Sequence, residues 1–155
     1  MAGFKMATTL RLVLFNLLFL ASVMGCATDA TTQGSDAMVA DQSLSGTAWW
    51  VEDIDGMGVI DSSHTTIEFA GDGRVGGDTG CNRYFGAVTI NGAEMSFGPL
   101  AGTRKACPGA VMDQEMRFYR AMENVSQWEI AETGLLHLRD ADGKDLVRAA
   151  ATDDP

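Results

Sequence analysis

Positive charge is scarce in this sequence, which holds 11 Lys and Arg residues against 21 Asp and Glu residues, for a formal net charge of −10. Lys5 and Arg11 lie in an N-terminal segment that we expect to be removed, which leaves 9 basic residues and a net charge of −12. Nucleic acid is a poor partner for such a chain, because phosphate binding needs clustered Lys and Arg. The same balance predicts repulsion from an anionic membrane surface.

Histidine and cysteine are also few, with two and three residues. The sequence has no Cys-x-x-Cys pair and no Gly-x-Ser-x-Gly segment, which are common signals of a zinc or redox site and of a serine hydrolase. Residues 71–76 and 140–145 resemble a dinucleotide fingerprint and part of a calcium loop, but they lack the helix start and the late Glu that these sites need. We interpret both as β-turns and predict no catalytic residue, no metal site and no cofactor.

A hydrophobic run long enough for a confident membrane span is also lacking. The run Leu10–Met24 is short and contains Asn16. Lys5 lies before the run and Arg11 at its start, and small residues follow its apolar part, which is typical of a secretory signal peptide. The segment Val23–Cys26 resembles the cleavage motif of bacterial lipoproteins, although its second residue, a Met, departs from that motif. We therefore expect residues 1–26 to form a lipoprotein signal peptide and Cys26 to carry a lipid anchor.

Other interpretations of this N-terminal segment remain open. Cleavage near Ala21 would leave Cys26 as a spare thiol in an ordinary secreted protein, and a transmembrane anchor is a further alternative. Ala27 rather than Asp follows the cysteine. By resemblance to Gram-negative sorting rules, this points to the outer membrane, with the domain anchored by lipid on the periplasmic face.

The rest of the chain divides by composition. Residues 27–45 are rich in Ala, Thr, Ser, Asp and Gln and contain no aromatic residue, which is typical of a flexible tether. Residues 150–155 have a similar composition and are predicted to form a disordered tail. Residues 46–149 remain as the folded part, which is long enough for one domain with one core.

Short runs in the folded part alternate apolar and polar residues and are separated by turn-forming pairs, which predicts antiparallel β-structure of about seven strands. The clearest hairpin has Asn91–Gly92 at its turn, and a type I′ turn would need positive φ at both residues. Alternation places Leu136 and Leu138 in the core and His137 towards solvent. We expect His64 in a loop.

Residues 110–124 break this pattern, because apolar side chains recur there at helical spacing. These residues are Met112, Met116, Tyr119 and Met122. They predict one amphipathic helix that packs this stripe on the sheet; alternatively, the Met residues form a pliable ligand surface. The predicted fold is therefore α+β, an antiparallel sheet of about seven strands that forms a half-open barrel packed with one amphipathic helix.

If Cys26 carries lipid, Cys81 and Cys107 remain as an even pair in an oxidising compartment. A disulfide is the default expectation for such a pair. The alternative is that they are reactive or metal-binding thiols.

The segments around both cysteines resemble a known family. Residues 80–86 (GCNRYFG) and 96–108 (SFGPLAGTRKACP) are similar to the META domain of bacterial heat-shock lipoproteins, and the similarity extends to Gln114–Glu115. The departures are the doubled Trp49–Trp50 and Gly102. The resemblance implies a compact, sheet-rich domain with one helix, similar to the lipid-binding pilotins that escort secretins. It also implies roles in envelope stress, heat stress or antibiotic tolerance, without an established reaction.

Two candidate binding regions follow from these segments. The first is a polar patch beside the cysteines, made of Asn82, Arg83, Thr103, Arg104 and Lys105. This patch either recognises an anionic partner, such as a lipid headgroup or a secretin tail, or is structural, with a turn-capping Asn and bases paired with nearby acids. The second is a hydrophobic cleft that would accept an acyl chain, lined by Trp49, Trp50, Phe85, Phe97 and Met116.

Three classes of function are compatible with these observations. We expect a non-catalytic, periplasm-facing lipoprotein that acts in cell-envelope maintenance or in the response to heat or antibiotic stress. The alternatives are a carrier or pilotin-like protein that binds an acyl chain or a secretin segment, and an enzyme. The expected partners are the membrane, reached through the lipid on Cys26, and a lipid or an envelope protein.

Overall fold

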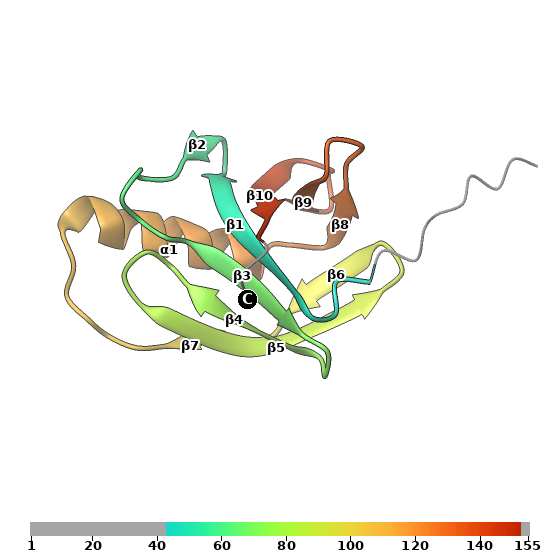
Figure 1. The fold of residues 1–155 in the computed structure, drawn as a ribbon, viewed down its shortest axis with the longest axis horizontal. Helices are drawn as coiled ribbons and strands as arrows, with labels where there is room; N and C mark the ends of the chain where they lie inside the picture. The colour runs from blue at the N-terminus through green and yellow to red at the C-terminus, as the bar shows by residue number, and fades with distance from the viewer. Residues whose placement is uncertain (1–42, 153–155) are drawn as a thin grey trace, which may run out of the picture. The chain divides into compact units, whose positions relative to one another are not determined.

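The computed structural model describes residues 43–152, which form one ten-stranded sheet and one helix (Figure 1). The strands are β1 (Thr47–Ile54), β2 (Met57–Gly58), β3 (Thr66–Ala70), β4 (Arg74–Asp78), β5 (Arg83–Asn91), β6 (Glu94–Phe97), β7 (Ala101–Gly102), β8 (Gln127–Ile130), β9 (Leu135–Arg139) and β10 (Asp145–Ala151). The helix, α1 (Gly109–Glu123), lies between β7 and β8 in the chain.

The sheet closes into a ring. The hydrogen-bonded order runs β10-β9-β8-β6-β5-β4-β3-β1, and β1 also pairs with β10. The register between β1 and β10 shifts between Val51 and Asp53, and such irregularities bend a strand and increase its twist. The joint between β6 and β8 consists of one residue pair, Glu94 with Gln127, and is the narrowest joint in this ring.

The expected class of fold, an antiparallel sheet with one helix, is confirmed, but the sheet has ten strands rather than about seven. The strands that sequence analysis missed are β2 and β7, which have two residues each. Two residues are too few to produce a visible alternation of apolar and polar side chains. Ala101 and Gly102 become a strand only because they pair with Phe85 and Tyr84 of β5.

Side chains that point into the ring form one continuous core with the inner face of α1. Its members include Trp49, Val51, Ile54, Ile67, Phe69, Val75, Tyr84, Val88, Met95, Phe118, Met122, Leu136, Leu138, Val147 and Ala149. Leu136 and Leu138 are fully buried, as the alternation in β9 predicted. The period of two along each strand is therefore what builds this core.

The folded region extends further than composition predicted at both ends. Leu44 is 2 % exposed and belongs to the core, although it lies in the predicted tether. At the other end, β10 continues to Ala151 and pairs with β1, so the strand includes the first two residues of the predicted tail. Small residues there complete the joint that closes the ring. Residues 1–42, with the predicted signal peptide and Cys26, lie outside the described residues, as do residues 153–155.

The β5–β6 hairpin forms as predicted, but its turn is shifted by one residue. Asn91 pairs with Glu94, so the loop consists of Gly92 and Ala93. Gly92 has φ +61°, whereas Asn91 and Ala93 have no positive φ. Positive φ at the first loop residue alone is the pattern of a type II′ turn, so the type I′ prediction is wrong. The observed register keeps Met95 in the core, at 1 % exposure.

Helix α1 lies within one residue of the predicted range but packs a different face on β1, β6 and β10. Its buried residues are Gln114, Glu115, Phe118, Ala121 and Met122. Met112 and Met116 are 42 % and 62 % exposed, so the prediction that they pack in the core is wrong. Buried hydrogen bonds of Gln114 and Glu115 account for this rotation. Within residues 43–152, no helix is long and apolar enough to cross a membrane.

Gly77 of β4 lies very close to the backbone of β3. It has φ +148°, and a Cβ atom there would lie 2.3 Å from the backbone oxygen of Thr66. We expect Gly77→Ala to lower the free energy of unfolding by about 2 to 4 kcal/mol, from backbone strain and overpacking together. Urea denaturation measures this change.

Gly134→Ala is the matched control, because Gly134 has φ +83° but no atom within 4 Å of the added Cβ. It isolates the backbone strain, which we expect to cost about 1 kcal/mol. Equal losses at the two positions would contradict the close contact with Thr66.

Candidate functional site

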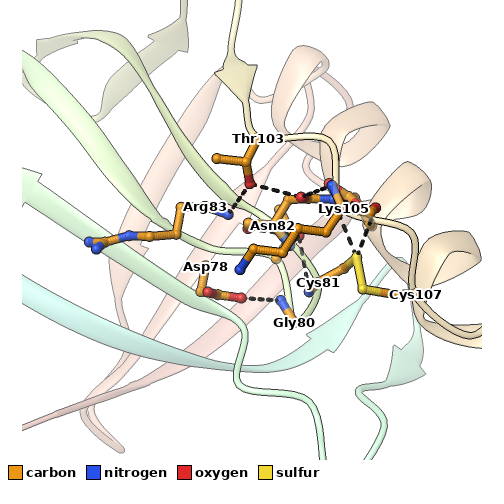
Figure 2. The surroundings of a disulfide bond; sticks show 10 residues. Asp78, Gly80, Cys81, Asn82, Arg83, Thr103, Lys105 and Cys107 are labelled. Atoms are coloured by element: carbon orange, nitrogen blue, oxygen red, sulfur yellow. Dashed lines mark hydrogen bonds between the residues drawn. A yellow bond between two sulfur atoms is a disulfide. The ribbon is translucent and has the colours of Figure 1, made fainter.

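A polar cluster surrounds a disulfide between Cys81 and Cys107, whose sulfur atoms are 2.05 Å apart (Figure 2). This confirms the pairing expected from the sequence. Cys81 lies just before β5 and Cys107 just before α1. The bond therefore ties the start of a central strand to the start of the helix. It also anchors residues 103–107, which we call the strap.

Asn82 is the centre of this cluster and is 4 % exposed. Its Oδ1 accepts hydrogen bonds from the Thr103 hydroxyl at 2.8 Å and from the Lys105 backbone N–H at 2.7 Å. Its Nδ2 donates to Glu115 Oε2 at 3.0 Å. One buried amide thus joins the start of β5, the strap and α1, and Figure 2 shows its bonds to Thr103 and Lys105 of the strap.

A tight turn before β5 fixes the position of Asn82. The Thr79 hydroxyl oxygen accepts the Asn82 N–H at 2.9 Å, and the Thr79 N–H donates to the Asn82 carbonyl at 2.8 Å. Asp78 Oδ1 accepts the Gly80 N–H at 2.8 Å. Thr79 and Asp78 therefore cap the turn that sequence analysis assigned to Asn82. The Asn82 side chain instead binds the strap and the helix.

Gln114 anchors the other side of the same helical turn and is fully buried. Its Oε1 accepts the Ile60 N–H at 2.8 Å. Its Nε2 donates to the hydroxyl oxygens of Ser63 at 2.8 Å and Thr65 at 3.1 Å. Because buried polar groups need hydrogen-bond partners, Gln114 and Glu115 determine which face of α1 meets the sheet. The apolar stripe predicted from periodicity contained neither residue, and only their part in the family motif marked them in the sequence.

An open groove of about 850 Å³ lies between α1 and the segment 100–106. Leu100 and Gly102 line one side, and Met112 and Tyr119 line the other. A Cβ atom at Gly102 would lie 2.6 Å from the Tyr119 hydroxyl, so glycine allows this close approach. Burial, the charge of Glu115 and a hydrogen bond with that carboxylate raise the pKa of Tyr119. A phenol is protonated at neutral pH in any case, so the Tyr119 hydroxyl can donate a hydrogen bond in this groove.

Arg83, Arg104 and Lys105 are exposed, and no salt bridge within residues 43–152 involves them. The pairing with nearby acids that one interpretation of the patch required is therefore not found in this part of the chain. The bases that do pair with acids are Arg74, Arg139 and Lys144. The backbone that carries the unpaired bases is held by the Thr103 N–H, which donates to the Arg83 carbonyl at 3.0 Å. These cations are available to an external anion.

The five residues predicted to line a hydrophobic cleft do not lie together. Trp49 is 4 % exposed and belongs to the core, and Phe97 is partly buried against it. Trp50, next along β1, points to the opposite face. Phe85 is 67 % exposed on β5, and Met116 is exposed on α1. Residues that looked alike in composition are separated because alternation sends neighbours to opposite sides of the sheet.

The other sequence candidates, His137 and the two turns that resemble binding motifs, take part in contacts within the fold. His137 Nδ1 lies 3.0 Å from Asp145 Oδ2, and Arg139 Nε donates to the other oxygen of that carboxylate at 2.7 Å. Burial opposes ionisation of Asp145, but hydrogen bonds from Arg139 and His137 outweigh it and lower the pKa of this carboxyl. Residues 71–73 and 140–144 connect strands, as predicted, whereas residues 74–76 belong to β4 and residue 145 to β10. Among residues 43–152, no group of three His, Cys, Asp or Glu side chains is placed to hold a metal ion.

Comparison with known proteins agrees with this architecture. The sequence pattern of the META domain matches residues 42–153, most of the chain. The chain belongs to the META domain family. The match confirms the resemblance seen around the two cysteines, and it also covers Leu44 and Ala151, the ends of the observed fold.

Solved structures support the same fold for this META domain. An NMR structure of a protein from Burkholderia xenovorans has a TM-score of 0.57 and 22 % identity, over 71 % of this chain and 84 % of that one. A second NMR structure has a TM-score of 0.53 and 21 % identity, over 67 % of this chain and 88 % of that one. No curated protein matches the sequence. At these identities the likeness concerns the fold alone.

The disulfide should supply a large part of the stability of the META domain. The two cysteines are 26 residues apart, and the chain-entropy relation assigns such a loop roughly 3.5 kcal/mol. We expect the double variant Cys81→Ala, Cys107→Ala to lose about 3 kcal/mol of unfolding free energy in urea. Cys26→Ala, which leaves the bond intact, should lose none. A loss below about 1 kcal/mol would mean that the Asn82 hydrogen bonds alone hold the strap.

Asn82→Asp should make stability depend on pH. The new carboxylate would face Glu115, whose Oε2 now lies 3.0 Å from Asn82 Nδ2. Two buried like charges repel, and protonation of either one removes the repulsion. In the variant the folded state therefore binds a proton more readily than the unfolded state does, so its deficit of about 3 kcal/mol at pH 7 should shrink as the pH falls towards 5.

Asn82→Ala provides the control for this pH effect. Like Asn82→Asp it removes the donor to Glu115, and it also removes the acceptor of Thr103 and Lys105, but it adds no charge, so its deficit should change much less between pH 7 and pH 5. Urea denaturation at several pH values measures both variants. Parallel pH profiles would show that charge repulsion is not the cause.

Proposed function

We propose that this chain is a lipid-anchored META-domain protein of the outer membrane that faces the periplasm. We further propose that it acts without catalysis in envelope maintenance or in the response to heat or antibiotic stress. The observation that carries this proposal is the Cys81–Cys107 disulfide, in a domain that follows a lipoprotein-like cleavage motif. Disulfides persist in oxidising compartments such as the periplasm.

The polar cluster supports a binding role better than a reaction. Asn82, Gln114 and Glu115 are buried, and their hydrogen bonds go to other parts of the fold. Their side chains hold the strap and the helix in place. The polar groups that face outward include the unpaired bases Arg83, Arg104 and Lys105, which bind anions rather than activate a nucleophile.

A pilotin-like carrier of an acyl chain is the less favoured alternative. The carrier hypothesis was based on five residues that the fold separates. The side chains inside the ring of strands pack against one another in one core. A partner that contacts the outside of the domain, such as a lipid surface or an envelope protein, fits this arrangement better.

Labelling in cells tests the proposal. The full-length chain would be expressed in a Gram-negative host with a fatty acid that carries a chemical tag, and the membranes would then be separated. We expect tagged protein in the outer-membrane fraction, because the lipid on Cys26 inserts there. Cys26→Ala should lose the tag and leave the membrane, whereas the double variant Cys81→Ala, Cys107→Ala should keep the tag. An untagged wild-type chain in the soluble periplasm would overturn the proposal.

A further inference from the structure

One outer face of the domain combines an exposed aromatic ring with unpaired bases. Alternation along β5 places Tyr84 inside the ring of strands and Arg83 and Phe85 outside it. Phe85 is 67 % exposed because its cross-strand neighbours, Gly76 on β4 and Ala101 on β7, are too small to cover it. A large apolar side chain therefore stands free on this surface.

The surface next to Phe85 is largely apolar, although Glu68 and Arg74 also line it. A depression of about 450 Å³ lies beside the Phe85 side chain and extends over β1, β3 and β4. Small residues contribute to its lining, among them Ala48, Ala70, Gly76 and Gly86. The exposed face of an antiparallel sheet normally carries polar side chains. An apolar depression with an aromatic ring at its edge is the kind of surface that marks an interaction site.

The unpaired bases border this apolar area. Arg83 lies two residues from Phe85 on the same face of β5. Figure 2 shows the side chains of Arg83 and Lys105 extending to the same side, away from the disulfide. The hydrogen bond from the Lys105 N–H to Asn82 fixes the backbone that carries the lysine. Asp78 faces Arg83 across the strands, and its Oδ1 is occupied by the Gly80 N–H.

We propose that the face made of Arg83, Phe85 and Lys105 rests on an anionic phospholipid bilayer. The two cations would bind lipid phosphates through charge-assisted hydrogen bonds. Phe85 would enter the boundary between headgroups and acyl chains, where aromatic side chains are stable. The proposal deepens the proposed function, because it names the face of the domain that meets the membrane.

The net charge of −12 for residues 27–155 does not oppose this contact. Salt screens interactions beyond a distance of about 8 Å at physiological ionic strength. A bilayer surface therefore responds to the bases that touch it more than to acids on the far side of the domain. The prediction of repulsion assumed that charge is spread evenly over the domain, whereas the fold brings unpaired bases close to Phe85.

Vesicle binding tests the proposal without the lipid anchor. Residues 27–155 contain all core residues and both disulfide cysteines, so this form can be studied alone. It would be sedimented with vesicles of phosphatidylcholine or of mainly phosphatidylglycerol. We expect binding to the anionic vesicles that weakens as salt is raised. Arg83→Ala and Lys105→Ala should each weaken it about fivefold, the factor that corresponds to about 1 kcal/mol for each base.

Phe85→Ser should weaken binding at least as much, and Arg83→Lys should restore most of the affinity lost in Arg83→Ala. The matched controls are Arg120→Ala, an exposed base on α1 without a salt bridge, and Met57→Ser, an exposed apolar residue on β2. Both controls should keep the wild-type affinity within about twofold, since neither belongs to this face. All substituted side chains are exposed, and an unchanged Tm shows that each variant is folded.

Three results would overturn the proposal: no binding of the wild-type protein to anionic vesicles, equal binding to phosphatidylcholine, or equal losses in the control variants. These results are independent of the labelling experiment, because this form of the protein carries no lipid. A tagged Cys26 together with a domain that ignores anionic vesicles would leave the proposed function standing and remove this surface from it.

Discussion

The buried amide of Asn82 is the contact on which the polar side of this domain depends. It binds the strap through Thr103 and Lys105 and binds α1 through Glu115. The disulfide next to it closes the same connection covalently. Apart from these links, hydrogen bonds between Thr103 and Arg83 hold the strap on β5, and most of the strap is exposed. The exposed bases are thus carried on a firmly held backbone.

Ring closure sets the second constraint. Pairing between β1 and β10 joins the two ends of the described domain, and α1 packs against both strands. The joint between β6 and β8 is a single residue pair, so packing across the core must help to hold the strands there. Hydrophobic burial is not directional, whereas the hydrogen bonds of Gln114 and Glu115 are. The directional bonds therefore decide how the helix lies on a core that would tolerate other rotations.

The distribution of charge shows why net charge is a poor guide to the surface of a folded domain. Acids outnumber bases strongly along the chain, yet Arg83 and Lys105 have no acidic partner within residues 43–152. Some bases elsewhere are paired, as Arg139 is with Glu129 and Asp145. Groups that remain unpaired after folding can form an interaction surface, and one of them, Arg83, lies beside an uncovered aromatic ring.

The sequence by itself determined the antiparallel strands, the position of the helix, the cysteine pair and the family. These features depend on local alternation, helical spacing and a contiguous motif, all of which are visible in the order of residues along the chain. Tertiary structure decided which face of α1 is buried, because Gln114 finds its partners more than 48 residues away along the chain. It also decided that β7 is a strand, that the predicted cleft residues are dispersed and that Phe85 is uncovered. Each of these outcomes depends on which distant residue lies opposite, and a sequence pattern does not contain that information.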